Sequence, residues 1–418
     1  MICRLLPALG RAGENFLSRR NFVRSGLGAA RKAAALVSLL YVAACTGGGL
    51  GGGGSDFGGG GQAVTGEVLG AGSVKVGLLL PLSANGNAGQ IAKDLKNAAD
   101  LAIRDFKTAG IQVLVKDDRG TVDGARAAAS AAISQGAELI IGPLFSASVT
   151  AVAQVAKASR VPVVAFSTDT TTASAGVYLL SFLPQGEVDR IVSYAASKGR
   201  RSFAALLPDS AYGTIVEAAL QRAVANARGR VMSVERYALD KTAMQGKANA
   251  VAALVKSGTV DAVFMPGGAQ EAPFLAQVMA AAGVDATKIS YLGSGQWDDP
   301  AVARESTLNG ALYPAPDNSG FAGFAQRYQA AFGTAPSRTA TLAYDAVSLA
   351  AGLTARFGDR RFSQDTLTNP SGYIGLDGAF RFLANGLNQR SLAVFQINNG
   401  TAVLVSPAPK TFAQAPGT

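Results

Sequence analysis

The sequence predicts an α/β protein with two lobes, each built on a doubly wound parallel sheet. Strand-length apolar runs alternate with amphipathic helix patterns from Val74 to Gly293. This alternation occurs as two runs of similar length, and residues 181–186 are expected to cross between them. A chain of 418 residues that is 48% hydrophobic is also long and apolar enough for one large or two medium-sized domains.

The first run opens with a strand and a helix that have clear patterns. Residues 74–80 read Val-Lys-Val-Gly-Leu-Leu-Leu, and such a nearly continuous apolar run is typical of a strand covered on both faces. Apolar residues from Ile91 to Phe106 then recur every three or four positions, which predicts a helix. The same patterns predict strands at 111–115, 138–141 and 162–166, and helices at 124–134 and 148–157.

The second run repeats the alternation. It predicts helices at 187–197, 213–225, 243–256 and 271–282, and strands at 203–207, 231–237, 260–265 and 289–293. The remaining stretch, 309–418, predicts helices near 321–332 and 341–357 and β-like segments at 380–382 and 393–397. Because this stretch is short and irregular, we expect it to complete the two lobes rather than to form a third domain.

The N-terminus has the features of an export signal. Residues 33–44 are mostly apolar, too few to span a bilayer, and follow Arg31 and Lys32. The segment ends in Val-Ala-Ala-Cys, which resembles the lipobox of bacterial lipoproteins, so residues 1–45 are predicted to be a signal peptide and Cys45 the lipidation site. The alternative is a buried cysteine at the end of an ordinary helix.

Two further features of this region bear on export. Arg19 and Arg20 lie in a segment that resembles the twin-arginine export motif, although two adjacent arginines also fit an ordinary basic leader. Residues 47–61 contain 11 glycines. Such a segment has too few apolar side chains to bury, so it is not expected to fold by itself. Residues 46–72 are therefore predicted to be a tether between the membrane and the folded body.

The charge distribution argues against nucleic-acid binding. The net charge of +10 includes +6 from residues 1–45. The other residues carry 31 basic and 27 acidic groups, mixed along the chain without a basic stripe.

The composition also argues against an enzyme. The sequence has no histidine, and its two cysteines, Cys3 and Cys45, lie within the first 45 residues. Histidine-based triads, the commonest zinc sites and thiolate clusters are therefore ruled out for the body, and we expect no cofactor and no metal. One enzymatic hypothesis is a hydrolase that uses Asp298 and Asp299, but the sequence offers no nucleophile–base pair to support it.

Five polar loops follow predicted strands. In open α/β sheets, loops at the carboxyl ends of the strands form the ligand crevice, and their hydroxyls and helix N-termini bind carboxylates and amines. Serine, threonine and aspartate at such positions also cap helices, which is the structural alternative for each of them. The loops are 83–87, 145–148, 167–172, 209–212 and 294–299.

Four segments resemble type I periplasmic binding proteins of the Leu/Ile/Val-binding superfamily: 77–83, 142–146, 161–167 and 209–213. Residues 178–182 and 293–300 are most similar to the branch called penicillin-binding protein activators, which are lipoproteins. The family fold has two lobes joined by three crossings. The resemblance implies lobe one as 73–184 plus 314–372, lobe two as 185–313 plus 373–408, and a disordered tail at 409–418.

The resemblance also implies ligand-binding residues. Ser146 matches the serine that holds a ligand carboxylate, and Tyr212 matches a tyrosine that closes on the ligand. The loop with Ser167, Thr168, Asp169 and Thr171 matches one that contacts carboxylate and amine.

Two positions depart from the family pattern. Residues 266–269 replace an expected aromatic, and the acid that meets the ligand ammonium is replaced by Gly295 or Gln296. Trp297 is either a platform for a sugar or ring, or a packed core residue.

Two functions therefore stay open. One is a solute receptor of an ABC importer, which binds a small polar, amino-acid-like ligand and works with a permease. The other is a lipoprotein that regulates peptidoglycan synthesis through contact with a penicillin-binding protein. Both place the protein in the periplasm of a Gram-negative bacterium, anchored to the inner or outer membrane through Cys45.

Overall fold

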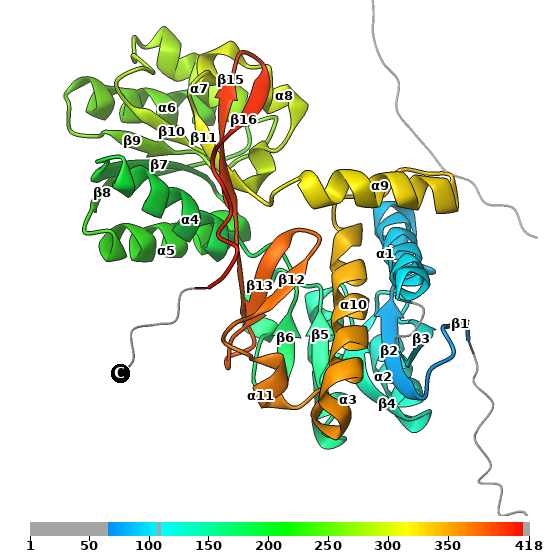
Figure 1. Cartoon of the computed structure of the whole chain (residues 1–418). Coiled ribbons are helices and arrows are strands. Elements are labelled where there is room, and N and C mark those ends of the chain that lie inside the picture. Colours follow the sequence, from blue (N-terminus) through cyan, green and yellow to red (C-terminus); the bar gives the residue numbers. More distant parts are fainter. Residues whose placement is uncertain (1–65, 107–109, 413–418) are drawn as a thin grey trace, which may run out of the picture. The chain divides into compact units, whose positions relative to one another are not determined.

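The described residues form two α/β lobes, which confirms the predicted fold class (Figure 1). The computed structural model describes residues 66–106 and 110–412. The predicted export signal, Cys45 and the tether as far as residue 65 lie outside these residues. None of the helices in the described part of the chain combines the length and the apolar character of a membrane span.

The first lobe has a six-stranded sheet in the order β1-β3-β2-β4-β5-β6. β1 is antiparallel to β3, and all other neighbours are parallel. The predicted parallel sheet therefore carries one antiparallel edge strand. The strands are β1 (Val68–Leu69), β2 (Val74–Leu80), β3 (Ile111–Asp117), β4 (Ala137–Ile141), β5 (Val163–Ala165) and β6 (Val177–Leu179).

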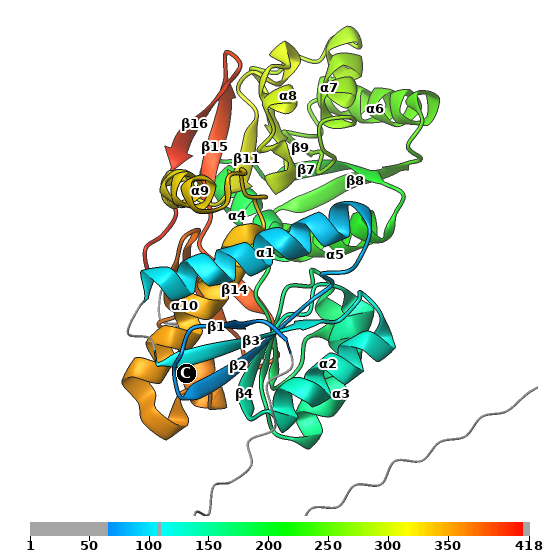
Figure 2. The same ribbon diagram turned by 90° about the vertical axis from the view of Figure 1, so that its right-hand side faces the viewer.

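Helices cover both faces of this sheet (Figure 2). α1 (Gly86–Asp105) and α10 (Ala340–Phe357) pack on one face, and α2 (Val122–Ser134) and α3 (Ser146–Ala158) pack on the other. The side chains under α1 and α10 form the first core of this lobe, and those under α2 and α3 form its second core. In β2, Leu78 and Leu80 point into the first core and Leu79 into the second, which explains the continuous apolar run. A Cβ on Gly77 would lie 2.8 Å from that of Ala132, so glycine lets α2 approach the sheet.

The second lobe has a seven-stranded sheet in the order β16-β15-β11-β10-β9-β7-β8. Its five strands from β7 to β11 are parallel, whereas β15 and β16 are antiparallel. The strands are β7 (Ser202–Pro208), β8 (Arg230–Tyr237), β9 (Ala262–Phe264), β10 (Ser290–Leu292), β11 (Leu312–Ala315), β15 (Ala393–Asn398) and β16 (Thr401–Ser406). One face carries α4 (Pro184–Ser197) and α5 (Ala211–Asn226), and the other α6 (Lys241–Lys256), α7 (Ala272–Ala281) and α8 (Pro300–Ala303).

The segment between the two sheets differs from the expected lobe boundaries. α9 (Ser319–Phe332) and α11 (Gln364–Leu367) belong to the first lobe, together with a small sheet of β12 (Tyr373–Gly375), β13 (Gly378–Phe382) and β14 (Asn388–Arg390). Phe382 lies in the first core with its ring 5.2 Å from that of Tyr178. Asn388 donates to the carbonyls of Leu179 and Ser181, which fixes β14 beside the first lobe. The chain therefore enters the second lobe for the last time near residue 391 rather than at 373.

The tail expected to be disordered contains four described residues, 409–412. The Ser391 hydroxyl donates to the carbonyl of Pro409, and the guanidinium of Arg381 lies 4.8 Å from the ring centroid of Phe412. Arg190 of α4 donates to the hydroxyl of Ser406, the last residue of β16, at 2.7 Å. After β16 the chain thus returns to the first lobe, a passage beyond the three expected crossings.

A buried charge cluster holds the chain where it passes between the lobes. Asp377 is fully buried. It forms an ion pair with Arg338 at 2.7 Å and accepts a hydrogen bond from the Thr341 hydroxyl at 2.6 Å. Burial lowers the pKa of Arg390, while the charges of Asp377 and Asp345 act in the opposite direction. Arg338 therefore pairs directly with Asp377, while Arg390 and Asp345 interact with this pair through their charges.

Arg338 and Arg390 also contact the first crossing between the lobes, at residues 181–182. Arg390 donates from Nε to the carbonyl of Ser181 at 3.2 Å. The guanidinium groups of Arg338 and Arg390 lie 5.4 Å and 4.7 Å from the ring centroid of Phe182. The crossing at 181–182 and the end of β14 are thus joined through one aromatic ring and its two cations.

Removing the central carboxylate should be strongly destabilising. We expect Asp377→Ala to lower the free energy of unfolding by about 3–5 kcal/mol, because it leaves buried arginine charge without a partner. Denaturant unfolding followed by circular dichroism measures the change. Asp123→Ala, which removes an ion pair whose carboxylate is almost fully exposed, is the control and should cost less than about 1 kcal/mol. Equal losses would contradict this role for Asp377.

Candidate functional site

In the first lobe, the loop after β4 leads directly into a helix. Ser146 is half-buried in the first turn of α3, and its neighbour Phe145 is the N-cap. The amides of a first helical turn have no partners within the helix, so this position suits an anion. Ser146 therefore lies where the sequence predicts a group that holds a carboxylate.

The loop after β5 combines an anchored serine with a local turn. The Ser167 side chain is buried and accepts from the amide of Asp169 at 3.1 Å, while its carbonyl accepts from Ser181 at 2.9 Å. Asp169 accepts from both the amide and the hydroxyl of Thr171. Asp169 and Thr171 thus cap a turn, the structural alternative, whereas Thr168 is exposed.

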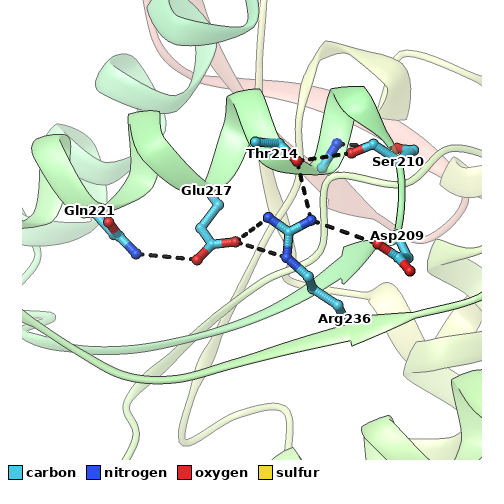
Figure 3. Close-up of polar contacts among 7 residues, drawn as sticks. Asp209, Ser210, Thr214, Glu217, Gln221 and Arg236 are labelled. Carbon is cyan, nitrogen blue, oxygen red and sulfur yellow. Dashed lines mark hydrogen bonds and ion pairs between the residues drawn. The ribbon is translucent and has the colours of Figure 1, made fainter.

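In the second lobe, a polar network positions the turn that carries Tyr212 (Figure 3). Ser210 caps α5 by accepting from the amide of Gly213 at 3.2 Å. Arg236 reaches across from β8 to pair with Glu217 at 2.5 Å, and it lies 3.9 Å from Asp209. These contacts fix both ends of the turn.

Tyr212 points from this turn toward the loops after β9 and β10. Its hydroxyl donates to the carbonyl of Pro266 at 3.5 Å, and that carbonyl also accepts from Ser294 at 2.8 Å. Burial, opposed by hydrogen bonds and reinforced by the nearby charges of Glu187 and Glu271, raises the pKa of Tyr212 to about 12. The phenol therefore stays protonated and can donate at neutral pH.

The second lobe contains a carboxylate that the sequence analysis missed. Glu187, in the first turn of α4, accepts from the amide of Gly295 at 2.9 Å. Burial raises its pKa to about 7. Gly295 was interpreted as the loss of an acid, yet an acid from another element lies against it. Because 108 positions separate the two residues, no local pattern could have indicated the contact.

Trp297 and Gln296 have different surroundings. Trp297 is fully buried, its indole donates to the carbonyl of Gly267 at 2.9 Å, and its ring fills the space over Gly293. It is a packed core residue, and its ring faces are not open to a ligand. Gln296 is exposed and its side chain lies beside Gly268.

The two aspartates considered for hydrolysis have structural partners. Asp298 accepts from Tyr313 at 3.3 Å, and Asp299 caps α8 by accepting from the amide of Ala301 at 2.7 Å. Within residues 66–106 and 110–412, no group of three or more acidic, histidine or cysteine side chains is placed to hold a metal ion. The arrangement in each lobe is that of hydrogen-bonding loops at strand ends.

Comparison with known proteins identifies relatives of the whole body. A family model described as periplasmic binding protein matches residues 73–402. Comparison with curated protein sequences finds no significant match. The solved structures described next are under 25% identical to this chain, so they bear on the fold alone.

Three of these solved structures illustrate the match. A Rhodospirillum rubrum protein described as a branched-chain amino acid ABC transporter has a TM-score of 0.71 at 18% identity, covering 79% of this chain and 99% of its own. A Desulfitobacterium hafniense substrate-binding protein in complex with Leu has a TM-score of 0.59 at 16% identity, with coverage of 79% and 99%. A solute-binding protein of R. palustris in complex with benzoate has a TM-score of 0.56 at 19% identity, with coverage of 82% and 98%.

The raised pKa of Glu187 has a cost in stability. Its value rises from 4.5 to about 7 on folding, so the folded state binds the proton more tightly and loses stability as the pH rises from 4.5 through 7. Glu187→Gln keeps an acceptor for Gly295 and should stabilise the protein by on the order of 1–3 kcal/mol at pH 8, but by little at pH 4.5. Thermal unfolding across this range tests it; a stabilisation independent of pH would contradict the assignment.

Proposed function

This chain belongs to the periplasmic binding protein family, whose members bind ligands and are not enzymes, and we propose that it captures a small polar, amino-acid-like solute for an ABC importer. One observation carries the proposal. Hydrogen-bonding loops follow the parallel strands in both lobes, Ser146 and Ser167 in one and Tyr212 in the other. Such loops bind small charged solutes without a metal or cofactor.

The two lobes have complementary chemistry in this proposal. The first turn of α3, with Ser146, supplies amide and hydroxyl donors to a carboxylate. Thr168 and the loop around Ser167 add hydroxyl groups at the neighbouring strand end. Tyr212 would turn its hydroxyl from the long contact with Pro266 to the solute, so closure of the lobes would complete the hydrogen bonds of the solute.

Substitution of Ser146 tests the carboxylate contact. We expect Ser146→Ala to raise the Kd of the bound amino acid about tenfold or more, because a hydrogen bond to a charged group is lost. The twenty amino acids are screened by thermal shift, and each hit is measured by titration calorimetry. Ser134→Ala, on the exposed side of α2, is the matched control and should leave Kd unchanged. A hit whose affinity survives Ser146→Ala would refute the contact.

Export and anchoring are a separate part of the proposal. Cys45 follows an apolar segment and small residues in the order expected of a lipoprotein signal. Lipid on Cys45 would hold the body at the membrane through the glycine-rich tether of residues 46–72, and Arg19 and Arg20 would direct the chain to the twin-arginine route.

Anchoring can be tested by fractionation. Cys45→Ala should move the protein from the membrane fraction to the soluble fraction and abolish labelling with radioactive palmitate, because the thiol that carries the lipid is gone. Arg19→Lys together with Arg20→Lys should block export only if the twin-arginine route is used. Membrane retention and labelling that persist in the Cys45→Ala protein would contradict lipidation at this site.

A second function, control of peptidoglycan synthesis through protein contacts, is favoured by one surface feature. Ile374 is 76% exposed, and Phe106 (43%) and Phe357 (38%) line the same cavity of about 320 Å³ in the first lobe. Exposed apolar side chains that gather at one place are typical of a protein-binding surface.

The test of this second function is a pull-down of penicillin-binding proteins from detergent-solubilised membranes. Ile374→Ser should abolish the capture, because it removes the most exposed of the three apolar side chains from the patch. Leu239→Ser, which replaces a leucine that is 71% exposed in the second lobe, is the control. Capture that survives Ile374→Ser, or no capture by the unaltered protein, would remove the support for this function.

A further inference from the structure

The two large sheets end in four edge strands, and three of these edges are protected. β1 is only two residues long, and the amide of Leu179 in β6 donates to the carbonyl of Gly386, which lies outside that sheet. β8 carries the charged side chains of Arg230, Glu235 and Arg236. Short length, cover by another segment and charge are means by which natural proteins keep an edge strand from pairing with another chain.

The fourth edge strand, β16, has none of these protections within the part of the chain that the structure describes. It reads Thr-Ala-Val-Leu-Val-Ser, without a charged residue, a proline or a glycine. Figure 2 shows β16 at the outer margin of the second lobe, and Val403 and Leu404 are 41% and 47% exposed. Short segments of this composition favour pairing with another strand. A bulge at Val405 ends the regular pairing with β15, so the open edge consists of residues 401–404.

The turn before β16 determines which backbone groups face outward. It has two residues, Asn399 and Gly400, and both have a positive φ, 48° and 82°. The residues that flank such a turn are hydrogen-bonded to each other, and bonded pairs alternate with non-bonded pairs along an antiparallel ladder. The amides and carbonyls of Ala402 and Leu404 therefore point away from β15. Among the described residues, no backbone group outside the sheet bonds to them.

A second copy of β16 matches this edge. Outward groups must meet outward groups, so in an antiparallel pair of two copies the two-fold axis passes through residue 402, 403 or 404. Only an axis at Val403 lets the amides and carbonyls of both Ala402 and Leu404 form their bonds within the open edge. This register sets the small Ala402 opposite the large Leu404, and it brings no like charges together because β16 carries no charge.

We propose that two copies of this chain form a two-fold dimer by antiparallel pairing of β16, which joins their second-lobe sheets into one continuous sheet. The backbone bonds of Ala402 and Leu404 and the contact between the exposed Val403 side chains form the centre of this interface.

The dimer leaves the strand-end loops away from the interface. β16 and β11 are both antiparallel to β15, and β11 is parallel to β10 and β9. The turn at 399–400 and the start of the open edge therefore lie at the end of the sheet opposite to the loops that follow β9 and β10. The inference does not depend on the proposed function, and solute binding can continue in the dimer.

Sedimentation velocity of the full chain, with Cys3 and Cys45 changed to serine, measures the association. We expect a dimer whose fraction rises with concentration in the micromolar range. Val403→Lys should leave a monomer over the same range, because it sets two ammonium groups opposite each other at the axis. Met232→Lys is the matched control: it places the same charge on β8, the other edge of the sheet, at a residue that is 42% exposed, and should leave the dimer unchanged.

Cysteine cross-linking with oxidised glutathione tests the register. In the same chain, Val403→Cys should form a disulfide-linked dimer, because a non-bonded pair on the axis brings its two Cβ atoms close together. Ala402→Cys alone should not, since the two copies of residue 402 are diagonal neighbours about 7–8 Å apart. A mixture of Ala402→Cys and Leu404→Cys chains should give the mixed dimer.

Several results would contradict the dimer. An unaltered protein that stays monomeric would overturn it and leave the edge to a strand of another protein or to solvent. A dimer that survives Val403→Lys, or that Met232→Lys disrupts equally, would overturn the assignment to β16. If Val403→Lys unfolds the chain, as circular dichroism would show, the Val403→Cys chain decides, because failure to cross-link would overturn the pairing.

Discussion

The buried ion pair between Arg338 and Asp377 is the interaction around which distant segments of the first lobe meet, beside the first crossing to the second lobe. Around it, Arg390 binds the first crossing through the carbonyl of Ser181, and both arginines stack on Phe182. Segments far apart in the sequence therefore meet in one charged, aromatic cluster. A hydrogen-bonded, charged cluster of this kind rigidifies the segments that it joins, which here include the first crossing at residues 181–182.

Two buried polar groups in the second lobe oppose its stability. Burial raises the pKa of Glu187 to about 7, so its ionised form is costly in the folded protein. The Tyr237 hydroxyl adds a second unfavourable group, buried and without a partner. Buried groups with perturbed pKa values gather at functional sites, and both of these groups lie near Tyr212.

Patterns in the sequence predicted the long elements well, because β2 and α1 have complete apolar periods. The strand β6 was missed because only a three-residue 3₁₀ turn, Thr170–Thr172, separates it from β5, so it falls outside the strand–helix alternation. The assignment of β12–β14 failed because it depends on Asn388 reaching Leu179. Ser146 could be placed at a strand end from sequence. The contact of Glu187 with Gly295 could not, because it arises only when α4 packs beside the loop after β10.

The central claim is that a solute is held by both lobes, and the most direct test is energy transfer between dyes on the two. Asp123→Cys in the first lobe and Lys288→Cys in the second, both at exposed side chains, provide the attachment sites in a chain from which Cys3 and Cys45 have been removed. The account predicts that a saturating amino-acid ligand found by calorimetry changes the transfer efficiency, and that Ser146→Ala shifts the midpoint to higher concentration. A ligand that binds without any change in transfer would contradict it.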